Sequence, residues 1–380
     1  MLNPLGCECL LGGLRLLSYA ASWNAIRSSH LFCCVSTAID RLCSQTINRM
    51  AGNKNLQAAN KAKKDEFYTQ LTDIENELRY YRDHFWGKTV LCNCDDPRVS
   101  NFFHYFAYSF EQLGLKRLIT TCYKNQNPDL FSSNDREQAI WLEYLGDRNA
   151  NRVPDPEEIG IRPLKGDGDF RSDECIELLK QADIVVTNPP FSLFREYVAQ
   201  LVKYDKKFLI IGNQNAITYR EIFPLIMQNK IWLGSHAGDM SFKVPEYYEE
   251  RATRFWIDNG GQKWRSLGNI CWFTNLDHKK RHEELILYKS YTPEEYSKYD
   301  NYNAVNVDKT SEIPCDYYGV MGVPITFLDK YNPEQFEIVG CTESEGKGFS
   351  NGLWDASSKV AQPLVGGKRI YKRLFIKRIQ

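Results

Sequence analysis

The sequence has no excess of charge of either sign and no long hydrophobic run. Its 48 Lys and Arg residues balance 48 Asp and Glu residues, so the overall charge neither favours nor excludes nucleic acid as a partner. Arg15, Asn24 and Arg27 interrupt the most apolar part of the N-terminus, and no stretch approaches the roughly 18 to 20 apolar residues that cross a membrane. These absences and the length predict a globular protein of at most two domains, with no membrane partner.

The spacing of a metal site is also missing. The 12 cysteines include no C-x-x-C pair, and no histidine cluster accompanies them, so we expect no bound metal. Cysteines inside apolar runs, such as 90–94 and 270–273, behave as small hydrophobes when reduced. Reduced thiols are typical of the cytoplasm, which is the location we expect.

The first 49 residues differ in composition from those that follow. They lack the basic, apolar, small-residue order of a secretion signal, and Met50 opens a polar stretch rich in Lys and Asn. We expect Met50 to be the initiator, so that residues 1–61 form a disordered extension that includes a wrongly assigned start. The alternative is a genuine amphipathic extension.

From residue 65 the sequence alternates strands with helices, which predicts an α/β domain with a mainly parallel sheet. Ser100 is a candidate cap for the helix that follows it. Beyond about residue 281 the alternation fades, which predicts a catalytic domain over 62–280 and a smaller region over 281–380. We expect helices over 73–85, 101–113, 172–181, 192–201 and 219–227, a short helix near 136–145 in a segment that is otherwise loop, strands over 89–94, 117–122, 183–187, 207–212, 230–234 and 269–276, and β-like pieces at 319–328 and 336–341.

Asn188, Pro189, Pro190 and Phe191, called the catalytic strip below, follow an apolar strand directly. The amino group of adenine is a poor nucleophile because its lone pair is delocalised into the ring, so it needs hydrogen-bond acceptors rather than a strong base. The Asn188 side-chain oxygen and the Pro189 carbonyl can accept from the amino hydrogens, and the two prolines fix the backbone. The strip therefore predicts methyl transfer to an amino nitrogen.

Phe191 offers a flat apolar face on which a base can stack. A base inside a duplex cannot reach such a pocket, so base flipping is implied. The alternative is a simple turn, since Asn-Pro and Pro-Pro are common turn dipeptides. The position of the strip at the carboxyl end of a strand, where open α/β sheets bind ligands, favours the catalytic interpretation.

The methyl donor is expected at neighbouring strand ends. At Asp95, Asp96 and Pro97, an acidic group can meet the positive charges of the donor; the alternative is an Asx turn. Asp167, Asp169 and Phe170 of the Gly-Asp-Gly-Asp-Phe segment can hold an adenosine; the alternative is a plain turn. Phe67 and Thr69 can offer an aromatic face and a hydroxyl; the alternative is that they only start a helix.

The connection over 235–268 is rich in aromatic and basic residues. If the strand before it is parallel to its neighbours, the connection emerges at the same sheet edge as Asn188. We then expect Arg251, Arg254, Lys263 and Arg265 to bind DNA; the alternative is an ordinary hairpin with packed aromatics. The tail over 368–378 predicts an edge strand, either with a basic side that faces DNA or protected by charge.

The chain resembles the EcoRI-type adenine-specific DNA methyltransferases from about Lys61 to near its C-terminus. The resemblance rests on DEFYTQ (65–70), DIENEL (73–78), CNCDDPRVSNFF (92–103), ITTCYKNQNP (119–128), GDGDF (166–170), ADIVVTNPPFSLFREY (182–197) and VMGVPITFLDKYNPEQFEIVG (320–340). In contrast to adenine methyltransferases at large, CNCDDP stands where a glycine-rich loop is usual, and no acidic residue ends the second strand.

The resemblance implies a class I, Rossmann-like methyltransferase fold with S-adenosylmethionine as donor, and a C-terminal target-recognition region. It places Phe67 and Thr69 in the family's N-terminal cofactor motif. It further implies a monomer that acts on double-stranded DNA as the modification half of a restriction-modification pair, with a cognate endonuclease acting on the same site.

Two other functions fit parts of the sequence. The strip can also serve methylation of cytosine N4 or of a protein glutamine, because each is a conjugated NH₂. A DNA-binding protein that has lost catalysis would have a damaged strip, and residues 188–191 are intact. The aromatic and basic C-terminal third favours a nucleic-acid substrate.

Overall fold

The computed structural model describes residues 67–94, 100–122, 139–151, 154, 158–246, 248–342, 349–355 and 357–380. All of them belong to one compact unit, Asn60–Gln380. The predicted extension over 1–61 and the donor candidates Asp95, Asp96 and Pro97 lie outside the described residues. No helix in the described ranges is long and apolar enough to cross a membrane.

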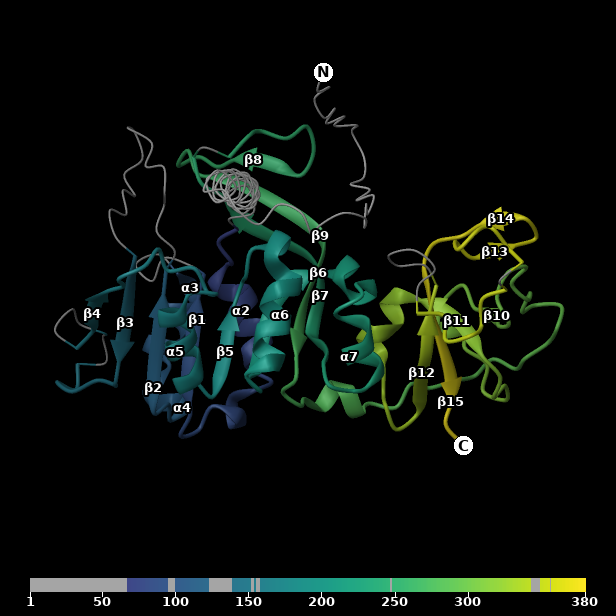
Figure 1. The fold of residues 1–380 in the computed structure, drawn as a ribbon, viewed down its shortest axis with the longest axis horizontal. Coiled ribbons are helices and arrows are strands. Elements are labelled where there is room, and N and C mark those ends of the chain that lie inside the picture. The colour runs from purple at the N-terminus through teal and green to yellow at the C-terminus, as the bar shows by residue number, and fades with distance from the viewer. Residues whose placement is uncertain are drawn as a thin grey trace, which may run out of the picture. The chain divides into compact units, whose positions relative to one another are not determined.

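A large mixed sheet forms the centre of this unit (Figure 1), in the order β4-β3-β2-β1-β5-β6-β9-β7, with β8 paired to β9. Strands β2, β1, β5 and β6 form the predicted parallel part, but the prediction of a mainly parallel sheet is wrong. Strands β3 and β4 pair antiparallel on one side, and β9 runs antiparallel to β6, β7 and β8 on the other. Strand β7 therefore runs in the same direction as β5. The bounds are β1 Thr89–Asn93, β2 Arg117–Thr121, β3 Ile140–Tyr144, β4 Gly160–Pro163, β5 Ile184–Thr187, β6 Lys207–Asn213, β7 Trp232–Lys243, β8 Phe255–Ile257 and β9 Lys263–Thr274.

Helices cover both faces of this sheet because its buried strands place alternate side chains on opposite faces. On one face, Leu91 and Val185 pack with residues of α5, α6 and α7. On the other, Val90 and Val186 pack with residues of α2 and α3. The helices are α2 Leu71–Leu78, α3 Asn101–Tyr108, α4 Phe110–Leu113, α5 Asp173–Gln181, α6 Phe194–Lys203 and α7 Phe223–Met227, with 3₁₀ turns η1 Arg82–His84, η2 Phe191–Leu193, η3 Gln214–Thr218, η4 Lys279–His282, η5 Thr310–Glu312 and η6 Ile325–Lys330.

Most predicted elements of this domain are confirmed, with local differences. Ser100 caps α3 by accepting a hydrogen bond from the Phe103 amide. The helix predicted over 73–85 ends at Leu78 and is followed by η1, although its predicted face, with Ile74, Leu78, Tyr81 and Phe85, is completely buried. The helix predicted over 101–113 is divided at Ser109 into α3 and α4.

The short helix predicted near 136–145 is wrong. Residues 140–144 form β3, which pairs antiparallel with β2 and carries β4 on its outer side. Leu142 and Tyr144 are buried while Trp141 and Glu143 are partly exposed, which is the two-residue period of a half-buried strand. In a run of five residues, the spacing of the apolar side chains does not distinguish a strand from a helix, so the pairing with β2 is needed to identify it.

A smaller sheet lies in the C-terminal region and has the order β10-β11-β15-β12. Its strand β15 corrects the prediction of an edge strand in the tail, because it lies between β11 and β12 with Leu374, Phe375 and Ile376 completely buried. Lys368 and Arg369 lie instead in a separate exposed hairpin. The bounds are β10 Val305–Asn306, β11 Met321–Pro324, β12 Phe336–Cys341, β15 Arg373–Arg378, and β13 Leu364–Val365 with β14 Lys368–Arg369 for the hairpin.

Candidate active site

The ends of the parallel strands β1 and β5 are tied together beside the catalytic strip. The Thr187 hydroxyl, at the end of β5, donates a hydrogen bond to the carbonyl oxygen of Asn93, the last residue of β1. The Tyr197 hydroxyl donates to the side-chain oxygen of Asn93, and burial raises the pKa of this tyrosine well above its usual range. Asn188 follows Thr187 directly, so the strip begins at a fixed point of the carboxyl edge.

Asn188 is buried, and its two polar side-chain atoms are used differently. Its Nδ2 atom donates to the Phe67 carbonyl oxygen at 2.7 Å and lies 3.3 Å from the Thr69 hydroxyl oxygen. Its Oδ1 atom is buried and accepts no hydrogen bond from any described residue. Because an unsatisfied buried acceptor costs free energy, this oxygen is suited to receive a hydrogen bond from a bound group.

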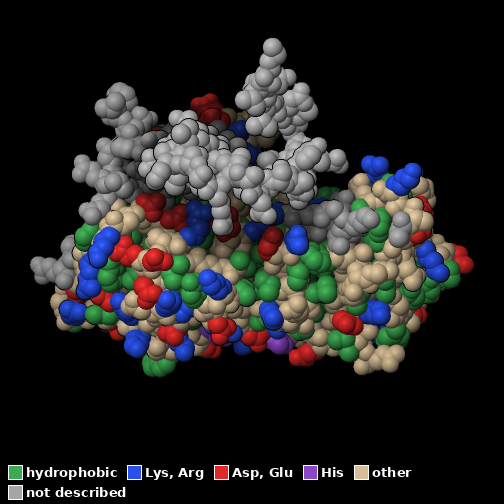
Figure 2. All heavy atoms as spheres, viewed as in Figure 1, with side chains coloured by type: hydrophobic (Ala, Val, Ile, Leu, Met, Phe, Trp, Pro, Cys, Tyr) green, Lys and Arg blue, Asp and Glu red, His purple; other side chains and the backbone are tan. Residues whose placement is uncertain are grey.

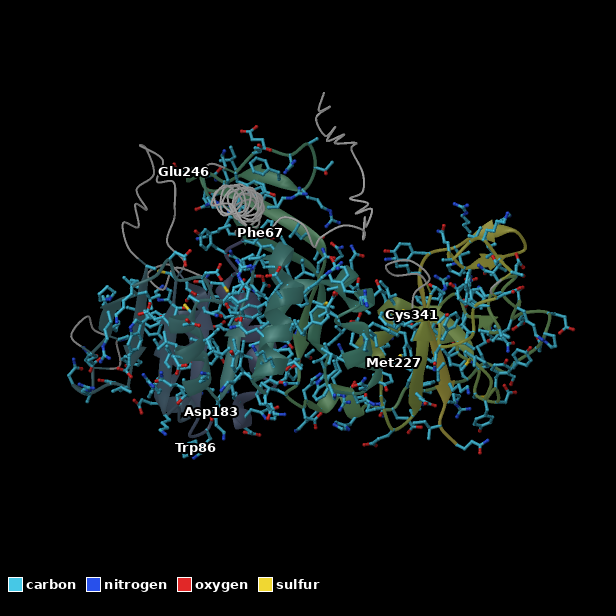
Figure 3. All side chains as sticks on the ribbon, viewed as in Figure 1. Phe67, Trp86, Asp183, Met227, Glu246 and Cys341 are labelled. Carbon is cyan, nitrogen blue, oxygen red and sulfur yellow. The ribbon has the colours of Figure 1, made fainter. Side chains whose placement is uncertain are left out.

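Phe67 and Thr69 lie against the strip, in a segment attached on two further sides. The Tyr68 backbone pairs with Lys243 of β7 through hydrogen bonds of 2.9 and 3.2 Å. The Asn101 side chain donates to the Thr69 carbonyl at 2.6 Å. The Phe67 ring stacks on Phe191 at a centroid distance of 5.6 Å, and Figure 3 shows Phe67 at the end of the sheet from which the hairpin with β8 rises.

The Gly166–Phe170 segment approaches the end of β2. Gly168 has a φ of +79°, and a Cβ atom there would collide with the Cys122 carbonyl oxygen, so this position requires glycine. The Phe170 ring is buried and packs edge-to-face against the Tyr197 ring, at a centroid distance of 5.0 Å and an interplanar angle of 70°. Phe170 thereby connects the segment to Tyr197 and, through it, to Asn93.

The two carboxylates of this segment have partners in the chain. Asp167 accepts from the Asp169 amide at 3.0 Å. Asp169 receives two hydrogen bonds from the Arg171 guanidinium, at 2.9 and 2.6 Å. Burial raises the pKa of Asp169, but the hydrogen bonds and charge of Arg171 outweigh it, so its pKa lies below the usual value. Asp169 is therefore held as a carboxylate.

The connection over 235–268, called the arm below, consists of the outer parts of β7 and β9 with β8. Because β7 runs in the same direction as β5, the arm emerges at the sheet edge that carries Asn188, as the sequence predicted for a parallel β7. Trp256 and Trp264 stack across β8 and β9 with an interplanar angle of 2°. The alternative reading of a hairpin with packed aromatics thus describes its backbone correctly.

Three of the four predicted DNA-binding residues brace the arm itself. Arg254 contacts Asp239 at 3.0 Å, Lys263 donates to the Tyr248 carbonyl at 3.2 Å, and Arg265 donates to the Arg254 carbonyl at 3.1 Å. Arg251 is exposed, with its guanidinium 6.0 Å from the Tyr248 ring centroid. Arg254 is exposed as well, but Arg251 is the member of this set whose guanidinium makes no hydrogen bond or ion pair with a described residue.

Sequence reasoning missed Glu77, which fastens the base of the arm. This completely buried side chain of α2 accepts from the backbone amides of Ser235 and His236 at 2.6 and 2.8 Å. Tyr81 donates to it at 2.9 Å. A carboxylate three residues after Ile74 on the buried helix face was the available signal, because a buried charge requires partners.

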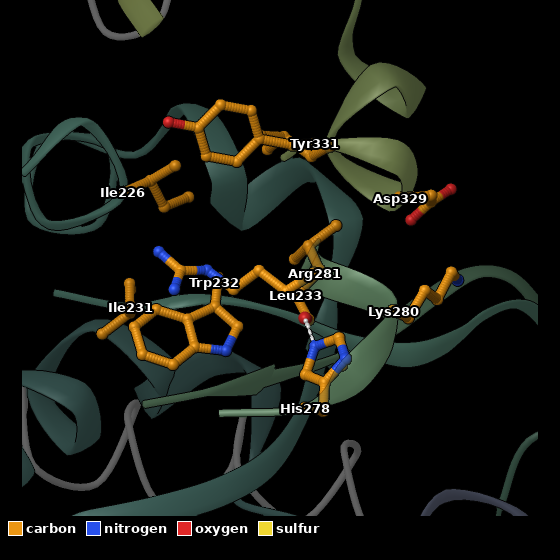
Figure 4. Close-up of a pocket in the computed structure, with 11 residues that line it drawn as sticks. Ile226, Ile231, Trp232, Leu233, His278, Lys280, Arg281, Asp329 and Tyr331 are labelled. Atoms are coloured by element: carbon orange, nitrogen blue, oxygen red, sulfur yellow. Dashed lines mark hydrogen bonds between the residues drawn. The ribbon is translucent and has the colours of Figure 1, made fainter. Parts of the chain in front are cut away.

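A narrow cavity lies away from the strip, between β7 and the segment around η6 (Figure 4). It has about 10 Å³ of free space, which is about the size of one water molecule. Trp232, His278, Arg281 and Asp329 are among its lining residues. None of its lining residues belongs to the catalytic strip, so the cavity is separate from the candidate active site, and its space is too small for a nucleoside.

Comparison with known proteins identifies the family. Residues 55–379 match the family described as adenine-specific methyltransferase EcoRI. The chain belongs to the EcoRI-type adenine methyltransferases. This assignment confirms the resemblance found in the sequence, and the mixed α/β sheet agrees with it. A comparison with solved structures gave no match.

Relatives of this EcoRI-type methyltransferase cover most of its length. It is 57% identical to the type II methyltransferase M.EcoRI of Escherichia coli over 295 residues, which are 77% of this chain and 90% of the relative. It is 40% identical to M.MgeORF184P of Mycoplasma genitalium over 334 residues, with 85% and 98% covered. It is 38% identical to M.MpnI of Mycoplasma pneumoniae over 331 residues, with 85% and 97% covered.

Proposed function

We propose that this methyltransferase transfers a methyl group from S-adenosylmethionine to the N6 amino group of an adenine flipped out of double-stranded DNA. The observation that carries the proposal is the buried Asn188 Oδ1 atom, which has no hydrogen-bond partner among the described residues and follows the parallel strand β5. An amino hydrogen of the base satisfies this acceptor, and the half-buried Phe191 ring supplies a stacking face.

The catalytic strip acts by accepting hydrogen bonds. When Asn188 Oδ1 and the Pro189 carbonyl accept hydrogen bonds from the two amino N–H groups, the nitrogen becomes pyramidal. Its lone pair is then no longer conjugated with the ring and can attack the methyl group. The donor supplies an electrophilic methyl group on a sulfonium. As the carbon–nitrogen bond forms, the methyl–sulfur bond would break with its electron pair left on sulfur as a neutral thioether, and solvent water would take up the surplus amino proton. Pro189 and Pro190 keep the acceptors in place because their φ angles are fixed.

We place the donor in the crevice that open α/β sheets form at a topological switch point, here at the carboxyl ends of β1 and β5. The chain crosses from β1 to β2 on one side, whereas β5 and β6 lie on the other, and such a switch point is where open α/β sheets bind nucleotides. This strand order also supports a class I, Rossmann-like fold. The described residues at the floor, Asn93, Thr187 and Asn188, are uncharged, so none of them repels a sulfonium.

Residues around this crevice are our candidates for holding S-adenosylmethionine. Asp167 and Asp169 can accept hydrogen bonds from ribose or adenine, and Gly168 brings them close to the end of β2. The exposed edge of Phe170 is small, so we assign its ring chiefly to packing against Tyr197. Phe67 and Thr69 adjoin the strip, and Asp95, Asp96 and Pro97 directly follow β1 in the sequence.

DNA binds along the carboxyl edge of the sheet in this proposal. Arg251 contacts phosphate, while Arg254, Lys263 and Arg265 keep the arm in shape. The C-terminal residues 281–380 recognise the target sequence. The Lys372 ammonium lies 3.4 Å from the Thr218 hydroxyl, just beyond the end of β6, which places the base of the β13–β14 hairpin at this same edge. Figure 2 shows mixed acidic and basic side chains on the face in view, so DNA contact is local rather than spread over that face.

We further propose that the enzyme acts as a cytoplasmic monomer in a restriction-modification pair, with a cognate endonuclease specific for the same site. The relatives' names as type II methyltransferases support this pairing. Reduced cysteines in the core are in keeping with a cytoplasmic location.

The experiment that tests the reaction is methyl transfer from labelled S-adenosylmethionine to unmethylated genomic DNA, followed by nucleoside analysis and sequencing of modified positions. We expect N6-methyladenine within one short recurring sequence. Label in N4-methylcytosine, label in protein, or no transfer by folded enzyme would each contradict the proposal.

A further inference from the structure

The orientation of the Asn188 amide is determined by the segment that crosses it. The Phe67 carbonyl can only accept hydrogen bonds, so the Asn188 atom that lies 2.7 Å from it must be the NH₂ group. The Thr69 hydroxyl oxygen, 3.3 Å from the same nitrogen, also accepts from it. Because a hydroxyl can donate as well as accept, the Phe67 carbonyl selects the orientation, and Thr69 helps to fix the position of the nitrogen. With the nitrogen held from this side, Oδ1 is directed away from the segment.

This orientation matters for the chemistry because the terminal torsion of an asparagine is broad and close to two-fold. If the amide turned over, its NH₂ group would meet the amino group of the adenine, and two donors would face each other. The acceptor that the reaction needs would then point at the Phe67 carbonyl. An amide that samples both orientations is competent for only part of the time.

We infer that Thr69 is a positioning residue that holds the Asn188 amide nitrogen at the place where the Phe67 carbonyl receives it, an inference that rests on the proposed function of Asn188. This differs from the predicted role of Thr69 as a donor-binding residue. Thr69 is 2% exposed, and its hydroxyl is directed at Asn188, which leaves little of it for direct contact with a donor.

Asn101 extends this arrangement by one residue. Its side chain at the first position of α3 donates to the Thr69 carbonyl at 2.6 Å. The Tyr68 backbone is paired with Lys243 on the other side of the segment. Thr69 is thus held between the helix and the arm, and its hydroxyl oxygen stays at a fixed place beside the Asn188 nitrogen.

The test compares Thr69→Val, which removes the hydroxyl at nearly constant shape, with Thr69→Ser, which keeps it. Single-turnover methyl transfer is measured with saturating S-adenosylmethionine and DNA, and the Kd of each ligand is measured separately. We expect Thr69→Val to slow transfer roughly tenfold, since one of the two hydrogen bonds that hold the Asn188 nitrogen in place is lost, with both Kd values within twofold of wild type. Thr69→Ser should transfer within twofold of wild type. If the valine variant does not fold, Thr69→Ala carries the same comparison.

Two results would overturn the inference. A tenfold weaker S-adenosylmethionine Kd with an unchanged transfer rate at saturation would make Thr69 a donor-binding residue. An unchanged transfer rate together with unchanged Kd values in Thr69→Val would show that the Thr69 hydroxyl neither positions Asn188 nor binds the donor. Asn188→Ala in parallel separates this from the proposed function: an active Asn188→Ala enzyme contradicts the role of the strip, whereas an inactive one beside an unaffected Thr69→Val contradicts only the positioning role.

Discussion

The buried carboxylate of Glu77 accepts a hydrogen bond from the backbone amide of His236, 2.8 Å away, and joins helix α2 to the base of the arm. The pairing of β7 with β9 shifts its register between Leu233 and Ala237. This bulge leaves the backbone amides of Ser235 and His236 outside the ladder, and both donate hydrogen bonds to the Glu77 carboxylate. A Cβ atom on Gly234 would collide with Glu77. The arm therefore leaves the sheet in a direction that one carboxylate fixes.

Replacing Glu77 with Gln should destabilise the protein by about 2 kcal/mol, because the amide NH₂ would face a backbone donor and charge-assisted hydrogen bonds would be lost. Urea unfolding measures the change. Glu75→Gln on the exposed face of the same helix is the matched control and should change stability by less than about 0.5 kcal/mol. Equal stability of the two variants would contradict the role of Glu77.

Gly168→Ala should weaken donor binding and cost about 1 to 3 kcal/mol of stability, because a positive φ and a collision with the Cys122 carbonyl oppose any Cβ atom there. Gly166→Ala is the control, since Gly166 has no heavy atom within 4 Å of a Cβ and no positive φ. Calorimetric titration with S-adenosylmethionine and thermal unfolding give the two quantities. If the Gly168→Ala protein bound S-adenosylmethionine as tightly as Gly166→Ala and were as stable, the proposal that Gly168 is needed for the close approach to Cys122 would be contradicted.

His278 should make stability depend on pH. Burial lowers its pKa, although the Leu233 carbonyl and the charges of Glu77 and Asp277 act in the opposite direction and Lys280 adds to the lowering. Its Nε2 atom lies 3.0 Å from the Leu233 carbonyl oxygen (Figure 4), while Nδ1 is buried without a partner among the described residues. Nε2 must therefore carry the proton of the neutral ring.

Because the folded pKa is lower than the unfolded one, the unfolded chain binds the proton more readily. The stability contributed by neutral His278 is complete above the ordinary value of 6.5 and is lost as pH falls below it. Wild type should lose more unfolding free energy than His278→Gln between pH 7.5 and 5.5. His282, whose pKa is raised by Asp277, is present in both proteins and cancels in the difference. Parallel pH curves would show that His278 does not contribute.

Arg251→Ala should weaken DNA binding and reduce the slope of log Kd against log salt by about one, because one phosphate contact disappears. Thermal stability should not change. Lys207→Ala, an exposed cation at the start of β6 and so on the opposite sheet edge, is the control and should leave the slope unaltered. If both variants lose the same affinity, the effect belongs to overall charge rather than to the arm.

The sequence predicted the parts of the fold that depend on local pattern. The apolar run before Asn188 became β5, and the cap at Ser100 formed as predicted. Strand β3 could not be predicted, because its five-residue run is identified as a strand only by its pairing with β2. The tail is an inner strand rather than an edge strand, because β15 pairs with both β11 and β12.

The candidate site shows the same division. Asn188 and its neighbours could be proposed from the sequence because the predicted chemistry needs them consecutively. The orientation of the Asn188 amide depends on Phe67, 121 residues earlier, and the direction of the arm depends on Glu77, 158 residues before Ser235. A single sequence can show that Glu77 lies on a buried helix face, but it does not show which distant residues such a side chain contacts. The bracing roles of Arg254, Lys263 and Arg265 likewise depend on backbone carbonyls or side chains brought near by the hairpin.

The most direct test of the account is single-turnover methyl transfer by Asn188→Ala, with S-adenosylmethionine and DNA affinities measured on the same protein. We predict that transfer falls by at least about 100-fold while both affinities stay within about tenfold of wild type, because the lost acceptor acts mainly in the transition state. Transfer at close to the wild-type rate would contradict the central claim that Asn188 activates the amino group.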